Sequence, residues 1–346
     1  MAAVSSGPLV VILGETASGK SGLAMKLAQK FDGEIISADS WAVYRQFDIG
    51  TAKPSKAQQA SIEHHLIDIA DAKAGFSAAE FKKLAAKAVD KISKAGKLPI
   101  LVGGTGLYID SLLFDYNFLP AGPSGKRKRL SSLNIEELLQ ELKAKDIDLA
   151  DIDIRNKRRL IRLLEVNGQR PSRQELRPNT LIIGLKLSKI ELKKRVTKRI
   201  DNMLAQGLEQ EVEELAKKYG WQAEPMKGIG YREWRDYFEA GQTLEQTRQK
   251  IICSNLQLAK KQRTWFRSSR YDQPPINSSH FSAETGSDTL NVPIGTYRAP
   301  EPASSQKLST SNMTNDHSAM TKRNNSIHWV SNQAEAVELV TTFLNK

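Results

Sequence analysis

The sequence has a single cysteine, Cys253, and no apolar run long enough to cross a bilayer. One thiol excludes an intramolecular disulfide and a zinc site built on several cysteines. The first residues, MAAVSSGPLVVILG, contain no basic side chain, and the apolar run LVVIL is shorter than the core of a signal peptide. We therefore expect a soluble, intracellular protein with no membrane partner.

Acidic residues are fewer than basic ones. The 346 residues include 51 Lys and Arg against 39 Asp and Glu, which gives a net charge of +12. This excess favours a polyanionic partner such as a nucleic acid, although the solvated surface of a basic enzyme would have the same composition. The length allows one sizeable α/β core and a smaller second domain.

Residues 1–118 alternate short apolar runs with amphipathic patterns. Strands are predicted at 9–13, 34–37 and 98–102, and helices at 20–31 and 76–95. Ser77, three residues before Glu80, is typical of a capping box at the start of the second helix. This alternation predicts an α/β fold with a P-loop NTPase-like parallel sheet that is covered on both faces.

The composition changes near residue 119, and residues 119–180 are predicted to form a helical, basic insertion domain. Residues 155–177 contain eight Lys and Arg and two Glu, which gives a local net charge of +6. Residues 181–271 return to the core with a strand at 181–187. One long helix follows, capped by Ser188 and carrying apolar residues at helical spacing, namely Val196, Ile200, Leu204, Leu208, Val212 and Leu215.

The last part of the chain is divided by composition. Residues 272–326 are rich in Ser, Thr, Asn and Pro with few large apolar residues, which predicts a disordered linker. Residues 327–346 then regain an apolar pattern and are predicted to add a terminal strand and helix to the core.

Residues 14–21, GETASGKS, match the phosphate-binding pattern G-x-x-x-x-G-K-[ST] between a predicted strand and a predicted helix. Backbone N–H groups in such a loop surround phosphate oxygens, the lysine neutralises phosphate charge, and the serine hydroxyl binds Mg²⁺. The motif does not identify the molecule that carries the phosphate. The predicted phosphate-binding residues are Gly14, Glu15, Thr16, Ala17, Ser18, Gly19, Lys20 and Ser21, with Ser21 as the metal ligand.

Two further loops follow predicted strands at the same edge of the sheet. Asp39 follows the second strand, where it could accept a proton, support a metal ion indirectly or simply cap a turn. The third strand leads into Gly103-Gly104-Thr105, where an ATPase usually carries an acidic residue. This difference weakens an ATP-hydrolysing function and leaves the Thr105 hydroxyl as a possible donor.

Several motifs occur in the order typical of the tRNA dimethylallyltransferases, also called tRNA isopentenyltransferases, of the bacterial type. They are GETASGKS, SADS with YRQFDIGTAKP, HHLID, ILVGGTGLY, NKRRLIRLLEV, GIGYREW and QLAKKQRTWFR, from about residue 10 to 267. The terminal IHWV and its helix also resemble the end of that family. The resemblance implies transfer of the dimethylallyl group from dimethylallyl diphosphate to N6 of an adenosine, with release of pyrophosphate. That adenosine lies just 3′ of the anticodon in tRNAs that read codons beginning with U.

The resemblance also implies roles for individual residues. Asp39 would be the general base, Thr105 would assist near the adenine and the diphosphate, and Lys20 would stabilise the leaving group with Mg²⁺. The implied partners are dimethylallyl diphosphate and the tRNA anticodon stem-loop, bound by a cytoplasmic monomer. The implied tRNA-binding residues are Asp39, Ser40, Trp41, Ala42, Thr105, Arg158, Arg159, Arg162, Lys227, Tyr231, Arg232, Lys260, Lys261, Arg263 and Arg267.

The motifs quoted above contain aromatic and basic residues of the kinds that bind RNA. A stacked adenine must leave its loop to reach a deep pocket, and aromatic side chains such as Trp41 and Tyr231 could stack on the splayed bases. Trp265 fits either stacking or core packing. Arg155, Arg159 and Arg162 are expected on one face of a helix, with Leu160, Leu163 and Leu164 facing inward. His64 and His65 of the HHLID motif are expected to be structural.

The chain departs from the family pattern at a few positions. Asn255-Leu256 stands where members often have Thr-Arg, and Lys227 stands where many have Arg. These departures bear on affinity and tRNA choice rather than on the reaction.

Two other functions remain open from the sequence. A nucleoside or small-molecule kinase would use the basic segment GKRKRL as a lid. A non-catalytic RNA-binding protein would retain a vestigial phosphate loop, although the presence of Lys20, Ser21, Asp39 and Thr105 argues against such decay.

Overall fold

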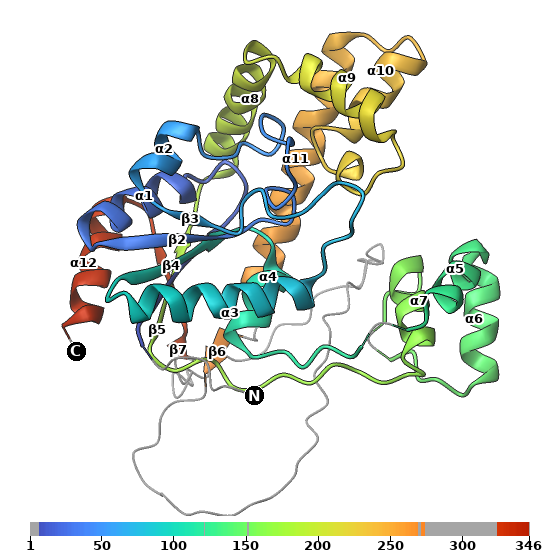
Figure 1. Cartoon of the computed structure of the whole chain (residues 1–346), viewed down its shortest axis with the longest axis horizontal. Coiled ribbons are helices and arrows are strands. Elements are labelled where there is room, and N and C mark those ends of the chain that lie inside the picture. Colours follow the sequence, from blue (N-terminus) through green and yellow to red (C-terminus); the bar gives the residue numbers. More distant parts are fainter. Residues whose placement is uncertain (1–6, 121, 151, 269–270, 274–323, 346) are drawn as a thin grey trace, which may run out of the picture. The chain divides into compact units, whose positions relative to one another are not determined.

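The computed structural model describes residues 7–120, 122–150, 152–268, 271–273 and 324–345. Its main feature is a six-stranded parallel sheet with the order β3-β2-β4-β1-β5-β8 (Figure 1). The strands are β1 (Leu9–Gly14), β2 (Gly33–Ala38), β3 (His64–His65), β4 (Leu98–Gly103), β5 (Thr180–Leu185) and β8 (Ile327–Val330). Short strands β6 (Asp272–Gln273) and β7 (Asn324–Asn325) form a separate two-stranded sheet. The predicted strands and the parallel sheet are confirmed, and β3 was not predicted.

Helices cover both faces of the main sheet. Helices α1 (Lys20–Lys30) and α12 (Gln333–Leu344) pack on one face, and α3 (Ala78–Lys94), α4 (Gly106–Leu113) and α11 (Leu244–Phe266) pack on the other (Figure 1). Strand β1 lies between the two layers, so Val10 and Ile12 contact the first layer while Val11 and Leu13 contact the second. Burial on both faces explains why this strand is a continuous apolar run.

The predicted capping box begins α3 as expected. The backbone N–H of Glu80 donates to the Ser77 hydroxyl at 3.2 Å, and the Glu80 carboxylate accepts from the Ser77 N–H at 2.8 Å. Each side chain thus satisfies a backbone donor that the first turn leaves unpaired. Among the described residues, no helix combines the length and the apolar character needed to span a bilayer.

The predicted long helix after Ser188 is two helices, α8 (Lys189–Ala205) and α9 (Leu208–Tyr219). Gly207 separates them with φ of +94°, a left-handed conformation that ends one helix and begins the next. The prediction was wrong because Leu204 and Leu208 continue the apolar spacing across this break. Smaller elements of the chain are α2 (Lys56–Ser61), α10 (Arg235–Glu239) and the single 3₁₀ turns η1 (Pro225–Lys227) and η2 (Arg232–Trp234).

The chain divides into two compact units. Of the described residues, the first contains 7–116, 173–268, 271–272 and 325–345, and the second contains 117–120, 122–150, 152–172, 273 and 324. The basic insertion was predicted at 119–180, and its last residues therefore belong to the first unit. Of the predicted linker, residues 274–323 lie outside the described residues.

The described part of the second unit contains three short helices, α5 (Ser124–Ser132), α6 (Ile135–Ala144) and α7 (Lys157–Glu165). They enclose a small apolar cluster of Leu130, Leu138, Leu142, Leu160, Ile161, Leu163 and Leu164. The inward direction of the α7 leucines is confirmed. Arg155 precedes the first residue of α7, so its predicted place on the same helical face as Arg159 and Arg162 was wrong.

Candidate active site

The carboxyl ends of three adjacent strands bring the predicted site loops together. Gly103 at the end of β4 lies opposite Ala38 of β2 on one side and Leu13 of β1 on the other. The residues that follow these three positions therefore lie side by side. Asp39 lies on one side of the Gly-Gly-Thr turn and the phosphate-binding loop lies on the other. This edge is where open α/β sheets bind ligands.

The phosphate-binding loop ends at the first turn of α1. Gly19 precedes the helix with φ of +98°, and Ala17 has φ of +59°. Among the described residues, no side chain caps the start of α1, so its first backbone N–H groups remain available to an anion. The Lys20 ammonium donates to the backbone carbonyl of Glu15 at 2.6 Å.

Two arginines of α8 complete a basic pocket around this loop. The pocket holds about 270 Å³ and is lined by residues 17–22 together with Arg195 and Arg199. Arg199 Nη1 lies 3.4 Å from the Thr16 hydroxyl, and Arg195 Nη1 lies 3.4 Å from the carbonyl of Ser18. Sequence reasoning missed both arginines, although their spacing of four residues places them on one face of the helix.

The electrostatics of this pocket suit a strongly negative ligand. Burial, followed by the nearby charge of Arg199, lowers the pKa of Lys20 to about 8. Burial also lowers the pKa of the Arg199 guanidinium from its usual value. Within the described part of the chain, Ser18 Oγ and Arg199 Nε are buried with no hydrogen-bond partner. Because buried polar groups are normally paired, these two groups fit phosphate oxygens.

The Asp39 carboxylate is fixed by its own turn. Oδ1 accepts from the backbone N–H groups of Trp41 at 2.8 Å and Ala42 at 3.3 Å. Both bonds use Oδ1, so neither occupies Oδ2. The backbone N–H of Ser40 donates to Thr105 Oγ1 at 3.1 Å and joins this turn to the end of β4. Turn capping and proton acceptance, which were alternatives from the sequence, are compatible in this geometry.

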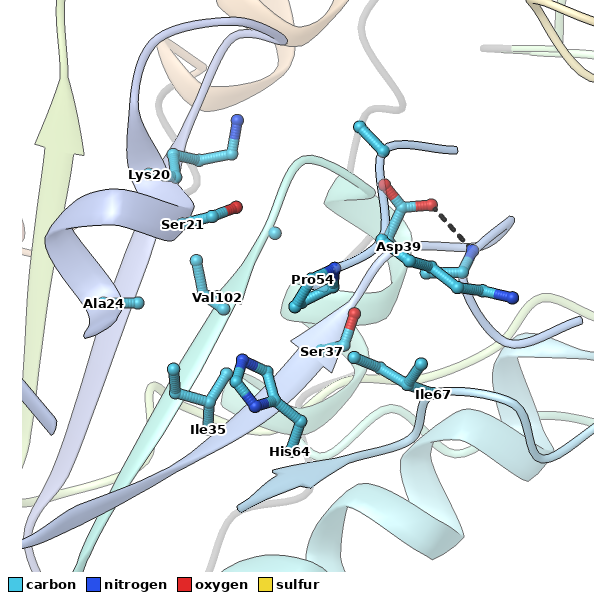
Figure 2. Close-up of a pocket in the computed structure, with 14 residues that line it drawn as sticks. Lys20, Ser21, Ala24, Ile35, Ser37, Asp39, Pro54, His64, Ile67 and Val102 are labelled. Carbon is cyan, nitrogen blue, oxygen red and sulfur yellow. Dashed lines mark hydrogen bonds between the residues drawn. The ribbon is translucent and has the colours of Figure 1, made fainter. Parts of the chain in front are cut away.

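A second, smaller pocket of about 70 Å³ adjoins the phosphate-binding loop. Figure 2 shows Lys20, Ser21 and Asp39 around its polar side, with apolar residues and His64 below. His64 Nδ1 lies 2.7 Å from the carbonyl of Ile62, and burial lowers the pKa of its ring. The neutral ring therefore donates from Nδ1. His65 lies outside this pocket, with Nε2 2.7 Å from the Glu34 carboxylate.

Several predicted tRNA-binding side chains make contacts inside the protein. Tyr231 is 1 % exposed and donates its hydroxyl to Glu211 at 2.7 Å, so the prediction that its ring stacks on a base was wrong. Arg162 donates to the carbonyl of Leu119 at 2.6 Å and pairs with the buried Glu165.

Other predicted cations also have partners. Lys227 pairs with Glu224 at 3.0 Å and Arg232 with Glu233 at 2.9 Å. Arg263 pairs with Glu15 of the phosphate-binding loop.

Most of the remaining predicted tRNA-binding cations are exposed to solvent, whereas two tryptophans contact other parts of the protein. Lys260, Lys261 and Arg267 are exposed on or beside α11, and Arg158 and Arg159 are exposed on α7 of the second unit. Trp41 is partly buried near Tyr44, with ring centroids 6.3 Å apart. Trp265 donates its ring N–H to the buried Asp110 at 3.0 Å, which agrees with the core-packing alternative.

Several known proteins are similar to this chain in sequence and in fold. The sequence model of a family described as IPP transferase matches residues 42–269. A tRNA dimethylallyltransferase of Pediococcus pentosaceus is 42 % identical over 276 residues, covering 75 % of this chain and 87 % of that protein. The crystal structure of a tRNA isopentenylpyrophosphate transferase from Bacillus halodurans has a TM-score of 0.58 and 35 % identity, covering 75 % and 86 % of the two chains. A eukaryotic dimethylallyltransferase acting on tRNA has a TM-score of 0.62 and 27 % identity, covering 75 % and 70 %.

Proposed function

Because the chain belongs to the IPP transferase family, we propose that it is an enzyme that transfers the dimethylallyl group from dimethylallyl diphosphate to tRNA. The acceptor is N6 of the adenosine that lies 3′ of the anticodon in tRNAs reading codons that begin with U. The observation that carries this proposal is that Asp39 and Gly103, the last residue of β4, line the smaller pocket, which shares Lys20 and Ser21 with the phosphate pocket. Thr105 is joined to the Asp39 turn through Ser40, and β4 leads into glycines rather than an acid. This arrangement supports a site that holds diphosphate while a neighbouring amine reacts.

The reaction forms one bond and breaks another. The N6 amine of adenine attacks the first carbon of the dimethylallyl group, and the bond from that carbon to the diphosphate oxygen breaks. The bonding electrons leave with pyrophosphate, whose charge Lys20, Arg199 and the backbone N–H groups of the loop stabilise. The proton lost from N6 passes to Asp39, whose carboxylate is oriented by Trp41 and Ala42.

The residues of the loop also fit a divalent metal ion. Ser21 is exposed at the start of α1 and lines both pockets, and the Asp39 carboxylate lines the smaller one. Hydroxyl and carboxylate oxygens are the protein ligands that Mg²⁺ prefers. Ser21 would hold Mg²⁺, which supplies additional positive charge for the leaving diphosphate.

The tRNA is bound by cations that the fold leaves exposed. On α11 these are Lys260 and Lys261, followed by Arg267 at the end of the helix, and on α7 they are Arg158 and Arg159. Phosphate contacts of this kind position the RNA without reading its sequence. The adenosine itself must leave the stacked anticodon loop to reach Asp39.

Pyrophosphate release separates this function from the two alternatives. We expect the purified protein, given dimethylallyl diphosphate and Mg²⁺, to release pyrophosphate only when tRNA is added. A kinase would instead form ADP from ATP with a small acceptor and no tRNA. A non-catalytic RNA-binding protein would bind tRNA with a steep salt dependence and release no pyrophosphate.

A further inference from the structure

The last turns of α11 contact the phosphate-binding loop through an ion pair. The Arg263 guanidinium donates from Nε to Glu15 Oε1 and from Nη2 to Glu15 Oε2, the second bond measuring 2.9 Å. The arginine side chain is 21 % exposed and the glutamate side chain 8 %. Two-point geometry and low solvent access distinguish this pair from an ordinary surface ion pair, which contributes little.

The neighbouring residue, Gln262, adds a second connection. Its Oε1 accepts from the backbone N–H of Thr16 at 2.7 Å, and its Nε2 donates to the carbonyl of Gly104 at 3.0 Å. The side-chain amide therefore joins the phosphate-binding loop to the turn that carries Thr105. A Cβ atom on Gly104 would lie 2.3 Å from Gln262 Nε2, so the glycine makes room for this connection.

Glu15 places a negative charge in the phosphate-binding loop, and Arg263 neutralises it. Its carboxylate belongs to the loop that binds an anionic ligand, and its carbonyl accepts from the Lys20 ammonium at 2.6 Å. An unpaired carboxylate at this position would repel diphosphate, because little water lies between the two charges to screen them. Arg263 cancels that charge and satisfies both carboxylate oxygens.

We propose that Arg263 is a positioning residue for the diphosphate end of the donor and not a contact for tRNA. It keeps Glu15 neutralised and, together with Gln262, holds the phosphate-binding loop against the Thr105 turn. This role rests on the proposed function only in taking diphosphate as the ligand of the loop.

The test compares wild type, Glu15→Gln, Arg263→Gln and the double variant Glu15→Gln/Arg263→Gln. Binding of inorganic pyrophosphate with Mg²⁺ is measured by calorimetry, and binding of tRNA by filter retention. We expect Arg263→Gln to weaken pyrophosphate binding about tenfold or more, because it leaves the Glu15 carboxylate unpaired. The double variant removes both charges, so its affinity should return to within about threefold of wild type.

Lys261→Gln is the matched control. Lys261 is exposed on the same helix and the change removes the same charge. We expect this variant to weaken tRNA binding and to leave pyrophosphate binding unchanged, the reverse of Arg263→Gln. If Arg263→Gln instead weakens tRNA binding as Lys261→Gln does, and Glu15→Gln does not restore pyrophosphate affinity, the positioning role is wrong.

The outcomes separate this proposal from the function on which it rests. A wild-type protein that binds pyrophosphate but never transfers a dimethylallyl group contradicts the function and leaves the positioning role intact. Wild-type pyrophosphate affinity in Arg263→Gln contradicts the positioning role alone. If Arg263→Gln does not fold, Glu15→Gln decides: it should bind pyrophosphate about threefold more tightly or better, and unchanged or weaker binding overturns the proposal.

Discussion

Ser40 donates its backbone N–H to the hydroxyl of Thr105 at 3.1 Å, which joins the ends of the neighbouring strands β2 and β4. Ser40 follows Asp39, whose carboxylate in turn accepts from the N–H groups of Trp41 and Ala42. The turn that carries the proposed base is thus held by its own backbone and by Thr105, which lies between β4 and α4. We therefore expect the position of Asp39 to depend on Thr105.

Replacing Thr105 by valine should slow transfer. Valine keeps the shape of threonine but cannot accept the hydrogen bond from Ser40, so the Asp39 turn loses its support. We expect the single-turnover rate at saturating tRNA and donor to fall about tenfold to a hundredfold. Thr105→Ser retains the hydroxyl and should stay close to wild type. Equal rates for the valine and serine variants would show that this bond does not position Asp39.

Replacing Asp39 by asparagine should separate proton transfer from binding. The asparagine carbonyl can accept from the same two N–H groups, so the turn is retained. An amide cannot take the N6 proton, and we expect the transfer rate to fall by about 10²–10⁴. Filter binding should give an unchanged tRNA affinity. A wild-type single-turnover rate would rule out Asp39 as the base.

The affinity for pyrophosphate should fall as the pH rises through about 8. Burial and the charge of Arg199 lower the pKa of Lys20 to about 8, and its protonated form is the one that attracts the anion. Below that pH the ammonium is present, and above it the lysine becomes neutral. Calorimetry from about pH 6.5 to 9.5 measures the change.

Lys20→Met is the control for this dependence. It should bind pyrophosphate weakly and lack the fall near pH 8, because the titrating group is absent. Parallel pH profiles for wild type and Lys20→Met would mean that another group controls the binding.

Replacing Gly104 by alanine should destabilise the protein. The new Cβ would lie 2.3 Å from Gln262 Nε2 and would displace the amide from Thr16 and from the Gly104 carbonyl. We expect the free energy of unfolding to fall by about 1–3 kcal/mol in urea titrations. Gly75→Ala, which meets no heavy atom of the described residues within 4 Å, should change it by less than about 0.5 kcal/mol. Equal stability of the two variants would contradict the close contact.

The central architecture could be predicted because local signals and tertiary structure agree. Strand β1 is apolar throughout since both of its faces are buried, and Ser77 and Glu80 are close enough in sequence to cap α3 by themselves. The site could be predicted in outline for the same reason. The ends of parallel strands lie together, so Asp39 and Thr105 were placed beside the phosphate-binding loop by topology alone.

The partners of the charged residues could not be predicted. Glu15 and Arg263 are 248 positions apart, and only the folded chain shows that they neutralise each other. Arg199 was missed because basic residues on a helix are as typical of a solvent-exposed face as of a binding site. The burial of the Tyr231 ring could not be predicted, because the sequence around an aromatic residue does not distinguish a ring that stacks on a base from one that is buried.

The most direct measurement of the proposed activity is mass spectrometry of tRNA treated with the protein, dimethylallyl diphosphate and Mg²⁺. After nuclease digestion, the fragment that contains the adenosine 3′ of the anticodon should be heavier by one dimethylallyl group replacing one hydrogen. The increase should occur only in tRNAs that read codons beginning with U and should be absent with Asp39→Asn. An unmodified adenosine in all of these tRNAs, with protein that binds both pyrophosphate and tRNA, would contradict the account.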